Sequence, residues 1–365
     1  MWMGFLIALA PLFQFFFSPI FGSLSDQRGR KSLIILGLSI GLVGFLLAVL
    51  GVTFSSLALL IVYRALFGIS TATMTVVQAS IVDISTPESK ARHFSLYNMA
   101  LGTGFALGPF LGGMLSDSNV VSWFSYSTPF LIGALFTGIN LVLLHWKFEE
   151  SRKLSKRTPL DVFRGIRHAK MAFQHPTLRF AFLGFFLYLF GWDYFSEFVS
   201  VTLMHLFDFG AAKVGNFYAY MGFLYALSTG LLTAPLIKRF PAQRLLLISM
   251  LLGGVYLVFF LLIRNPIFFW GFFPGQIFIL GLFFPVASTY VSDHASEDEQ
   301  GEMLGAYHSV QALALIFSPL FGGSLVGAIP AMPIYLGSAM MCLGGLVFAA
   351  SYARKRSLHR VDDNA

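Results

Sequence analysis

Two carboxylates lie inside a long apolar stretch of this 365-residue chain. Asp193 and Glu197 stand four residues apart between Phe180 and Leu206, so a helix places both on one face. Counting about 1.5 Å per residue from Arg179 places Asp193 about 21 Å along that helix, at or beyond the middle of a bilayer. Burial and mutual repulsion favour the protonated form of such a pair, so we expect it to bind and release protons. The structural alternative is that both acids face an outer vestibule filled with water.

Two further polar residues lie in another apolar run, at 57–82. Arg64 is embedded about seven residues inside it, where a charge costs at least about 2.5 kcal/mol on insertion scales. It is therefore expected to face a cavity or a partner; the alternatives are a structural ion pair or a side chain that reaches the outer interface. Gln78 contributes either a polar contact to a cavity or a hydrogen bond between helices.

The stretches that carry these residues are long enough to cross a membrane. Hydrophobic residues make up 56% of the sequence, charged residues only 11%, and the mean hydropathy is +0.75, whereas soluble domains carry about 25% charged residues. An all-α polytopic membrane protein is therefore predicted. With roughly 20 apolar residues per span, the eleven predicted spans lie at about 2–24, 32–52, 57–82, 94–116, 127–146, 179–205, 214–237, 245–263, 267–291, 303–328 and 331–353.

The basic residues predict the orientation of these spans. Twenty-one of the 24 Lys and Arg residues fall in alternate loops, at 25–31, 84–93, 147–179, 238–244 and 353–360. Because loops rich in Lys and Arg stay in the cytoplasm, the C-terminus is predicted to be cytoplasmic and the N-terminus external. The expected location is the cell membrane.

One stretch of the sequence, from Asp83 to Gly113, has a related second copy later in the chain. A shift of 210 residues places Asp83, Tyr97, Pro109, Gly112 and Gly113 on Asp293, Tyr307, Pro319, Gly322 and Gly323. Two parallel halves of this kind are typical of secondary transporters. The predicted domains are an N-terminal bundle at 1–147, a central cytoplasmic loop at 148–178, a C-terminal bundle at 179–354 and a tail at 355–365.

A second, weaker repeat concerns the start of the chain. Met3-Gly4-Phe5-Leu6 recurs as Met221-Gly222-Phe223-Leu224, which pairs the first predicted span with the second span of the C-terminal half. A helix equivalent to 179–205 is therefore expected ahead of Met1, for a total of twelve spans. The alternative is a protein that functions with eleven.

Two clusters of small and charged residues stand out within this framework. The first is the loop after the first predicted span, with Gly22, Asp26, Arg28, Gly29, Arg30 and Lys31. Its Gly29 permits a sharp turn, and its basic residues anchor the loop in the cytoplasm, but anchoring does not explain the aspartate. In the second cluster, Gly104, Gly108 and Gly112 share one helix face, followed by Gly113, and Pro109 bends the helix. A hinge or seal is expected there, with ordinary helix packing as the alternative.

These motifs resemble those of the major facilitator superfamily. Gly22-Ser-Leu-Ser-Asp26-Gln-Arg-Gly-Arg-Lys31 is similar to its loop signature, with departures at Ser25 and Gln27, and Tyr63-Arg64-Ala-Leu-Phe-Gly68 looks like its embedded arginine motif. The run Gly104–Gly113 matches the signature associated with its proton-driven exporters, including the tetracycline exporters. The resemblance implies two pseudo-symmetric helix bundles. It also implies that Asp26 latches the two bundles together by facing the N-terminal end of the span at 303–328.

The function expected from this resemblance is proton-coupled efflux of a small apolar or amphipathic molecule, such as a drug, by alternating access. Alternatives are a proton-coupled importer of a sugar or organic acid, and a membrane remnant that transports nothing. Partners are protons, the small molecule and the lipid bilayer, the protein acting as a monomer without nucleic acid. No catalytic, phosphate-binding, dinucleotide or metal-ligand spacing is present, so neither an enzyme nor a cofactor nor a metal is expected. The single cysteine, Cys342, excludes a disulfide within the chain.

Overall fold

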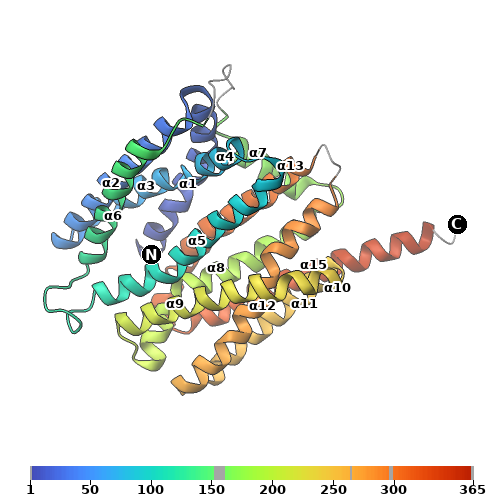
Figure 1. Cartoon of the computed structure of the whole chain (residues 1–365). Helices are drawn as coiled ribbons and strands as arrows, with labels where there is room; N and C mark the ends of the chain where they lie inside the picture. Colours follow the sequence, from blue (N-terminus) through green and yellow to red (C-terminus); the bar gives the residue numbers. More distant parts are fainter. Residues whose placement is uncertain (1, 152–160, 264, 296–298, 363–365) are drawn as a thin grey trace. The chain divides into compact units, whose positions relative to one another are not determined.

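The computed structural model describes residues 2–151, 161–263, 265–295 and 299–362, so parts of the predicted central loop and tail lie outside the described residues. Each of the eleven predicted stretches is helical over most of its length (Figure 1), and the all-α fold class is confirmed. Nine helical stretches of the described chain are long and apolar enough to cross a membrane. The other two predicted spans are α5 and α8, each 29 residues long.

The chain divides into two compact units. The N-terminal unit comprises residues 2–165 and 210–219, and the C-terminal unit comprises 166–209 and 220–365. The first helices are α1 (Trp2–Arg28), α2 (Arg30–Thr53), α3 (Leu57–Thr71), α4 (Met74–Asp83), α5 (Pro87–Leu115) and α6 (Thr128–Lys147). The later elements are α7 (Arg164–Gln174), α8 (Arg179–Phe207), α9 (Ala211–Leu227), the π-helical turn η1 (Ser228–Thr233), α10 (Ala234–Arg239), α11 (Ala242–Phe259), the 3₁₀ turn η2 (Phe260–Leu262), α12 (Pro266–Asp293), α13 (Gln300–Gly322), α14 (Leu325–Ala328) and α15 (Met332–Asp362).

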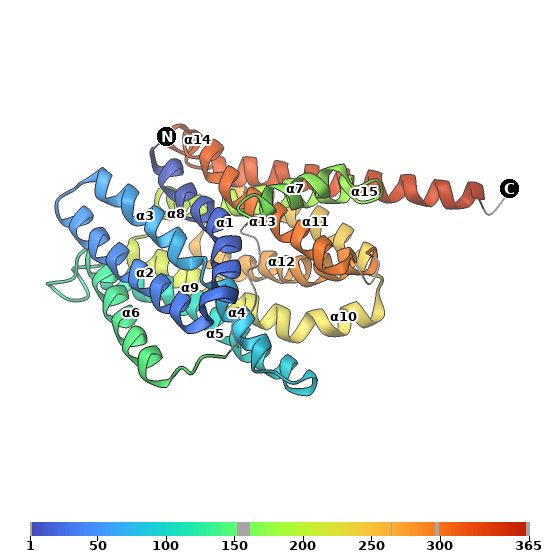
Figure 2. The same cartoon turned by 90° about the horizontal axis from the view of Figure 1, so that it is seen from above.

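Several helix bounds differ from the sequence prediction; α5, for example, begins at Pro87 rather than at 94. The predicted span 303–328 ends at Gly322, because consecutive glycines weaken a helix, and the short α14 follows. The last helix passes the predicted boundary at 354 and continues to Asp362, as Figure 2 shows for α15. The central loop, predicted as a polar connection, contains the helix α7.

Apolar packing between α1, α2 and α4 forms a core in the N-terminal unit. Phe21 of α1 lies against Leu33 and Ile34 of α2, together with Ala72 and Val76, and all five are at most 4% exposed. This core lies at the end of α1 and the start of α2, so it fixes the loop between them.

The C-terminal unit is built around a glycine seam between α8 and α15. Gly184 faces Gly344, and Gly191 faces Gly337, one pair seven residues from the other along each helix. A Cβ atom at Gly184 would lie 2.8 Å from the Gly344 carbonyl oxygen, so only glycine permits this approach of the two backbones.

An aromatic cluster fills the space beside the seam. The Phe185 ring lies 5.7 Å from Phe283, 6.2 Å from Tyr290 and 5.7 Å from Phe348, measured between centroids. These distances fall in the range favoured by aromatic pairs. Phe185, Phe283 and Phe348 are fully buried, so α8, α12 and α15 share one core.

Two prolines in α12 leave backbone carbonyls without their usual donors. Pro274 and Pro285 have no N–H to offer Trp270 and Gly281, four residues earlier. The Tyr220 hydroxyl donates to the Trp270 carbonyl at 3.2 Å, and the Thr233 hydroxyl donates to the Gly281 carbonyl at 3.3 Å. Side chains from α9 and η1 therefore satisfy both carbonyls.

Candidate functional site

The loop between α1 and α2 turns at Gly29, as the sequence predicted. Its φ is +93°, a conformation that side chains with a Cβ rarely adopt. The turn brings Arg30 back over the last residues of α1, where it is only 3% exposed. A guanidinium this buried needs several partners.

Arg30 has those partners in two aspartates and a serine. Its Nη1 lies 2.8 Å from an Asp26 carboxylate oxygen, and its Nε donates to Asp83 at 2.9 Å. Nη1 also donates to the Ser25 hydroxyl. Asp83 was not predicted as a partner of Arg30, although the repeat begins at that residue. The latch between Asp26 and the other bundle stays a prediction.

The remaining residues of the predicted gate loop have more peripheral contacts. Arg28 is exposed, and its carbonyl accepts a hydrogen bond from Ser32 at 2.9 Å. Lys31 donates from Nζ to the His145 carbonyl at 2.9 Å, at the end of α6. The Gly22 carbonyl accepts from the Ser25 hydroxyl at 2.7 Å. The loop is thus anchored at several points within the N-terminal unit.

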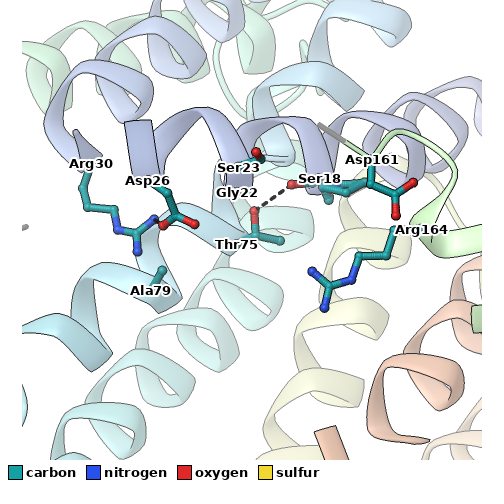
Figure 3. A pocket seen from close by; sticks show the side chains of 10 residues that line it. Ser18, Gly22, Ser23, Asp26, Arg30, Thr75, Ala79, Asp161 and Arg164 are labelled. Atoms are coloured by element: carbon teal, nitrogen blue, oxygen red, sulfur yellow. Dashed lines mark hydrogen bonds and ion pairs between the residues drawn. The ribbon is translucent and has the colours of Figure 1, made fainter. Parts of the chain in front are cut away.

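A cavity of about 480 Å³ opens beside this network (Figure 3). Asp26 and Arg30 line it from the gate loop, and Asp161 and Arg164 line it from the end of the central loop. Two carboxylates and two guanidinium groups therefore line a cavity within the N-terminal unit.

Arg64 is held by backbone carbonyls of α1. Its Nε donates to the Leu6 carbonyl at 2.8 Å and its Nη2 to the Ile7 carbonyl at 3.0 Å. Pro11 stands four residues after Ile7 and offers it no N–H. Arg64 therefore donates a hydrogen bond to a carbonyl that Pro11 leaves without its usual donor. Of the two environments expected for Arg64, a cavity or a partner, this contact is with a partner.

Gln78 of α4 reaches α5. Its amide nitrogen lies 3.1 Å from the Tyr97 hydroxyl, in a hydrogen bond between two helices. This contact matches the interhelical alternative considered for Gln78. Its part in a substrate cavity stays a prediction.

Asp193 and Glu197 lie on α8 and are both half-buried. They follow Gly191 by two and six residues, so at about 100° per residue they lie about 200° and 240° around the helix from it. They therefore occupy the side of α8 turned away from the glycine seam with α15. The seam fixes the rotation of α8 and with it the direction of both carboxylates.

The glycine cluster of α5 makes its close contact at its last residue. A Cβ atom at Gly113 would lie 2.7 Å from the Ala211 carbonyl oxygen, and Gly215 of α9 faces it. In the described chain, a Cβ atom at Gly104, Gly108 or Gly112 would meet no atom within 4 Å. The hinge or seal that the sequence predicts at Gly104, Gly108, Pro109, Gly112 and Gly113 stays a prediction.

Among the residues that the structure describes, no group of His, Cys, Asp and Glu is suited to a metal ion. What they do form is a helical protein with spans long enough to cross a membrane, an internal repeat, embedded polar residues and a charged loop between α1 and α2. These features define the class of polytopic membrane transporters.

Comparison with known proteins gives the family. Residues 2–279 and 181–364 match the Major Facilitator Superfamily, and the chain belongs to it. The chain is 30% identical over 339 residues to tetracycline resistance protein, class C, of Escherichia coli, covering 89% of this chain and 80% of the relative. It is 26% identical over 349 residues to multidrug resistance protein 2 of Bacillus subtilis, covering 94% and 84%.

A solved structure supports the fold. The human organic anion transporter TETRAN superposes with a TM-score of 0.66 at 21% identity, covering 94% of this chain and 83% of that one. At this identity the likeness concerns the fold alone. The predicted family and the predicted similarity to tetracycline exporters are both confirmed.

Proposed function

We propose that this transporter exports a small apolar or amphipathic molecule in exchange for protons, by alternating access. The observation that carries the proposal is the pair Asp193 and Glu197 on the side of α8 away from the seam with α15. Similarity to proteins named for tetracycline and multidrug resistance supports export and a drug-like cargo.

The chemistry follows from competition at one site. An ionised carboxylate in an apolar environment is costly, so binding a proton and binding a cargo can exclude each other there. A proton that enters from outside then displaces the cargo, and loss of that proton to the cytoplasm allows the next cargo molecule to bind.

Proteoliposomes with an imposed pH gradient test this function. We expect an acidic interior to drive uptake of tetracycline well above the uptake in protein-free liposomes, with simultaneous alkalinisation of the interior. Uptake driven only by an acidic exterior would indicate symport, and no response to either gradient would contradict proton coupling.

Variants of α8 locate the coupling site. Asp193→Asn and Glu197→Gln are expected to lose uphill uptake and keep downhill exchange, whereas Asp208→Asn, at the exposed end of the same helix, should keep both. Normal uphill transport by both neutral variants would place coupling elsewhere in the protein.

We further propose that the α5 glycines form a hinge or seal. Gly108→Leu is expected to insert and fold, because its Cβ position is open in the described chain, yet to transport nothing. If Gly108→Leu transports at the wild-type rate, the α5 glycines serve only in helix packing.

The orientation is a proposal of its own. The basic residues indicate a cytoplasmic C-terminus in a plasma membrane. A reporter fused after Ala365 should then be cytoplasmic, and one inserted between Ser116 and Ser127 should be external. Both reporters on the same side would contradict this orientation.

A further inference from the structure

The N-terminus of α2 lacks a cap of its own. Gly29 occupies the N-cap position and has no side chain with which to accept a hydrogen bond. The first backbone N–H groups of a helix have no partner within the helix, so Arg30 and Lys31 need an acceptor from elsewhere.

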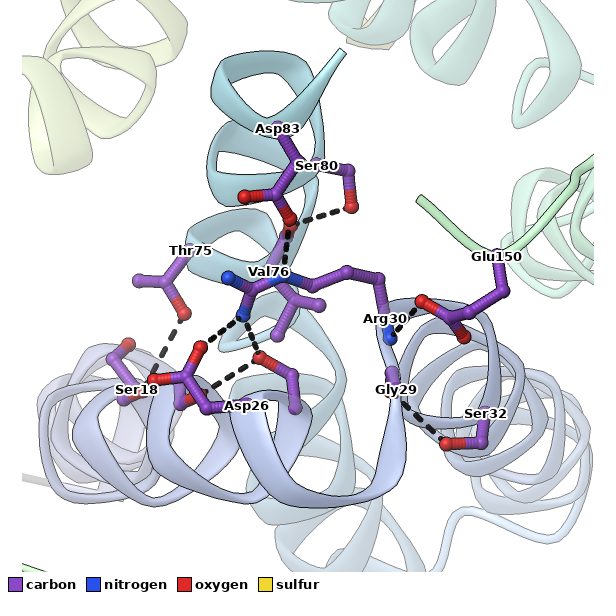
Figure 4. A network of polar contacts seen from close by, with 12 residues as sticks. Ser18, Asp26, Gly29, Arg30, Ser32, Thr75, Val76, Ser80, Asp83 and Glu150 are labelled. Carbon is purple, nitrogen blue, oxygen red and sulfur yellow. Dashed lines mark hydrogen bonds and ion pairs between the residues drawn. The ribbon is translucent and has the colours of Figure 1, made fainter. Parts of the chain in front are cut away.

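Glu150, at the start of the central loop, supplies that acceptor. One carboxylate oxygen lies 2.7 Å from the Arg30 backbone nitrogen, and the other lies 3.1 Å from the Lys31 backbone nitrogen (Figure 4). A negative group at a helix N-terminus is also favoured by the helix dipole. Glu150 therefore caps α2 from 120 residues away.

Gly29 makes room for this carboxylate. A Cβ atom at Gly29 would collide with the Glu150 carboxylate. Glycine is therefore required at position 29 for two reasons: the turn needs a positive φ, and the capping carboxylate needs the space that a Cβ atom would fill.

The capping is reciprocal. Lys31 of α2 donates from Nζ to the His145 carbonyl, in the last turn of α6. Carbonyls in the last turn of a helix also lack partners within the helix. The start of α2 and the end of α6 therefore satisfy each other through Glu150 and Lys31.

Glu150 also acts on the charged network through Arg30. Its carboxylate holds the Arg30 backbone, while Asp26 and Asp83 hold the guanidinium of the same residue. We propose that Glu150 is a positioning residue of the cytoplasmic gate: by fixing the start of α2 it places the Arg30 guanidinium between its two aspartates. This inference rests on the proposed transport function.

Labelling of a cysteine in the cavity tests the proposal without requiring transport. The reporter is Ala79→Cys, a residue that lines the cavity beside the network, in a Cys342→Ser background. Labelling by a maleimide should accelerate at least about threefold in Glu150→Ala, because release of α2 loosens the Arg30 network. Glu150→Gln keeps one acceptor oxygen and should give an intermediate rate.

Glu149→Gln is the matched control. Glu149, like Glu150, is exposed, and its neutralisation changes the charge of the loop equally. It should leave labelling at the wild-type rate. Gly29→Ala should label as fast as Glu150→Ala, because its Cβ atom takes the place of the carboxylate.

Transport kinetics separate positioning from a general structural role. Glu150→Ala and Glu150→Gln should lower kcat and leave KM for the cargo unchanged, in protein that stays monodisperse after purification. Labelling and kcat at wild-type values in both variants would overturn the proposal. If the wild type transports nothing, the proposed function fails, and the labelling series alone still supports or overturns the role of Glu150.

Discussion

The two units carry the same repeat but use its polar positions differently. In the N-terminal unit Asp83 pairs with the buried Arg30, and a hydrogen bond joins Gln78 to Tyr97. These contacts join α2, α4 and α5 through individual side chains.

The C-terminal unit has other residues at the positions 210 later. Asp293 is in no ion pair within the described chain, and Gln78 is replaced by Ser288. Tyr307, the counterpart of Tyr97, is 1% exposed, and its hydroxyl has no well-formed hydrogen bond. This unit relies on the glycine seam and the aromatic cluster instead. Loss of a polar group should therefore lower the free energy of unfolding more in the N-terminal unit. Added side-chain volume should lower it more in the C-terminal unit.

The largest effect is expected at Arg30. Arg30→Met leaves Asp26 and Asp83 without their shared cation and should lower the free energy of unfolding by about 3 kcal/mol. Asp293→Asn, at the corresponding aspartate of the other unit, should change it by less than about 0.5 kcal/mol. Thermal unfolding of the purified protein in detergent measures both. Equal losses would contradict the contrast between the units.

An intermediate effect is expected at the glycine seam. Gly191→Ala pushes a Cβ atom against the Gly337 carbonyl, so the seam must open, at a cost of about 2 kcal/mol. Gly108→Ala adds the same atom to an open position in the N-terminal unit and should be nearly neutral. The same unfolding measurement applies, and a neutral Gly191→Ala would show that the seam adjusts freely.

The smallest effect distinguishes the two tyrosines. Tyr97→Phe removes the hydrogen-bond partner of Gln78 and should cost about 0.5 to 1 kcal/mol. Tyr307→Phe removes a buried hydroxyl without a well-formed partner and should be neutral or stabilising. A larger loss of unfolding free energy in Tyr307→Phe than in Tyr97→Phe would show that the Tyr307 hydroxyl stabilises the fold through the nearby Ser288 and Gln311.

Hydropathy and local sequence predicted much of this fold. The eleven apolar stretches are helical because burial in lipid requires every backbone group to be paired within the helix. The turn at Gly29 was predictable because only glycine readily adopts its φ. Both properties depend on residues close together in the chain.

Contacts between distant residues could not be predicted in this way. Glu150 lies 120 residues from Arg30, and Gly113 faces Gly215 from another helix, so no local pattern connects them. The partner of Arg64 did leave a signal, since Pro11 in the first predicted span marks a carbonyl that lacks a donor. A proline within an apolar span therefore indicates a carbonyl that an embedded polar side chain can satisfy.

The way Arg64 is held has an electrostatic consequence. Carbonyl dipoles satisfy its donors without cancelling its charge, and no carboxylate of the described residues lies within ion-pair distance of it. A full positive charge then persists in a region of low dielectric constant, where its field is weakly screened. That field attracts anions and the negative end of a dipolar molecule, and it repels cations. The carbonyl contacts of Arg64 thus leave the N-terminal unit with a local positive field at the start of α1.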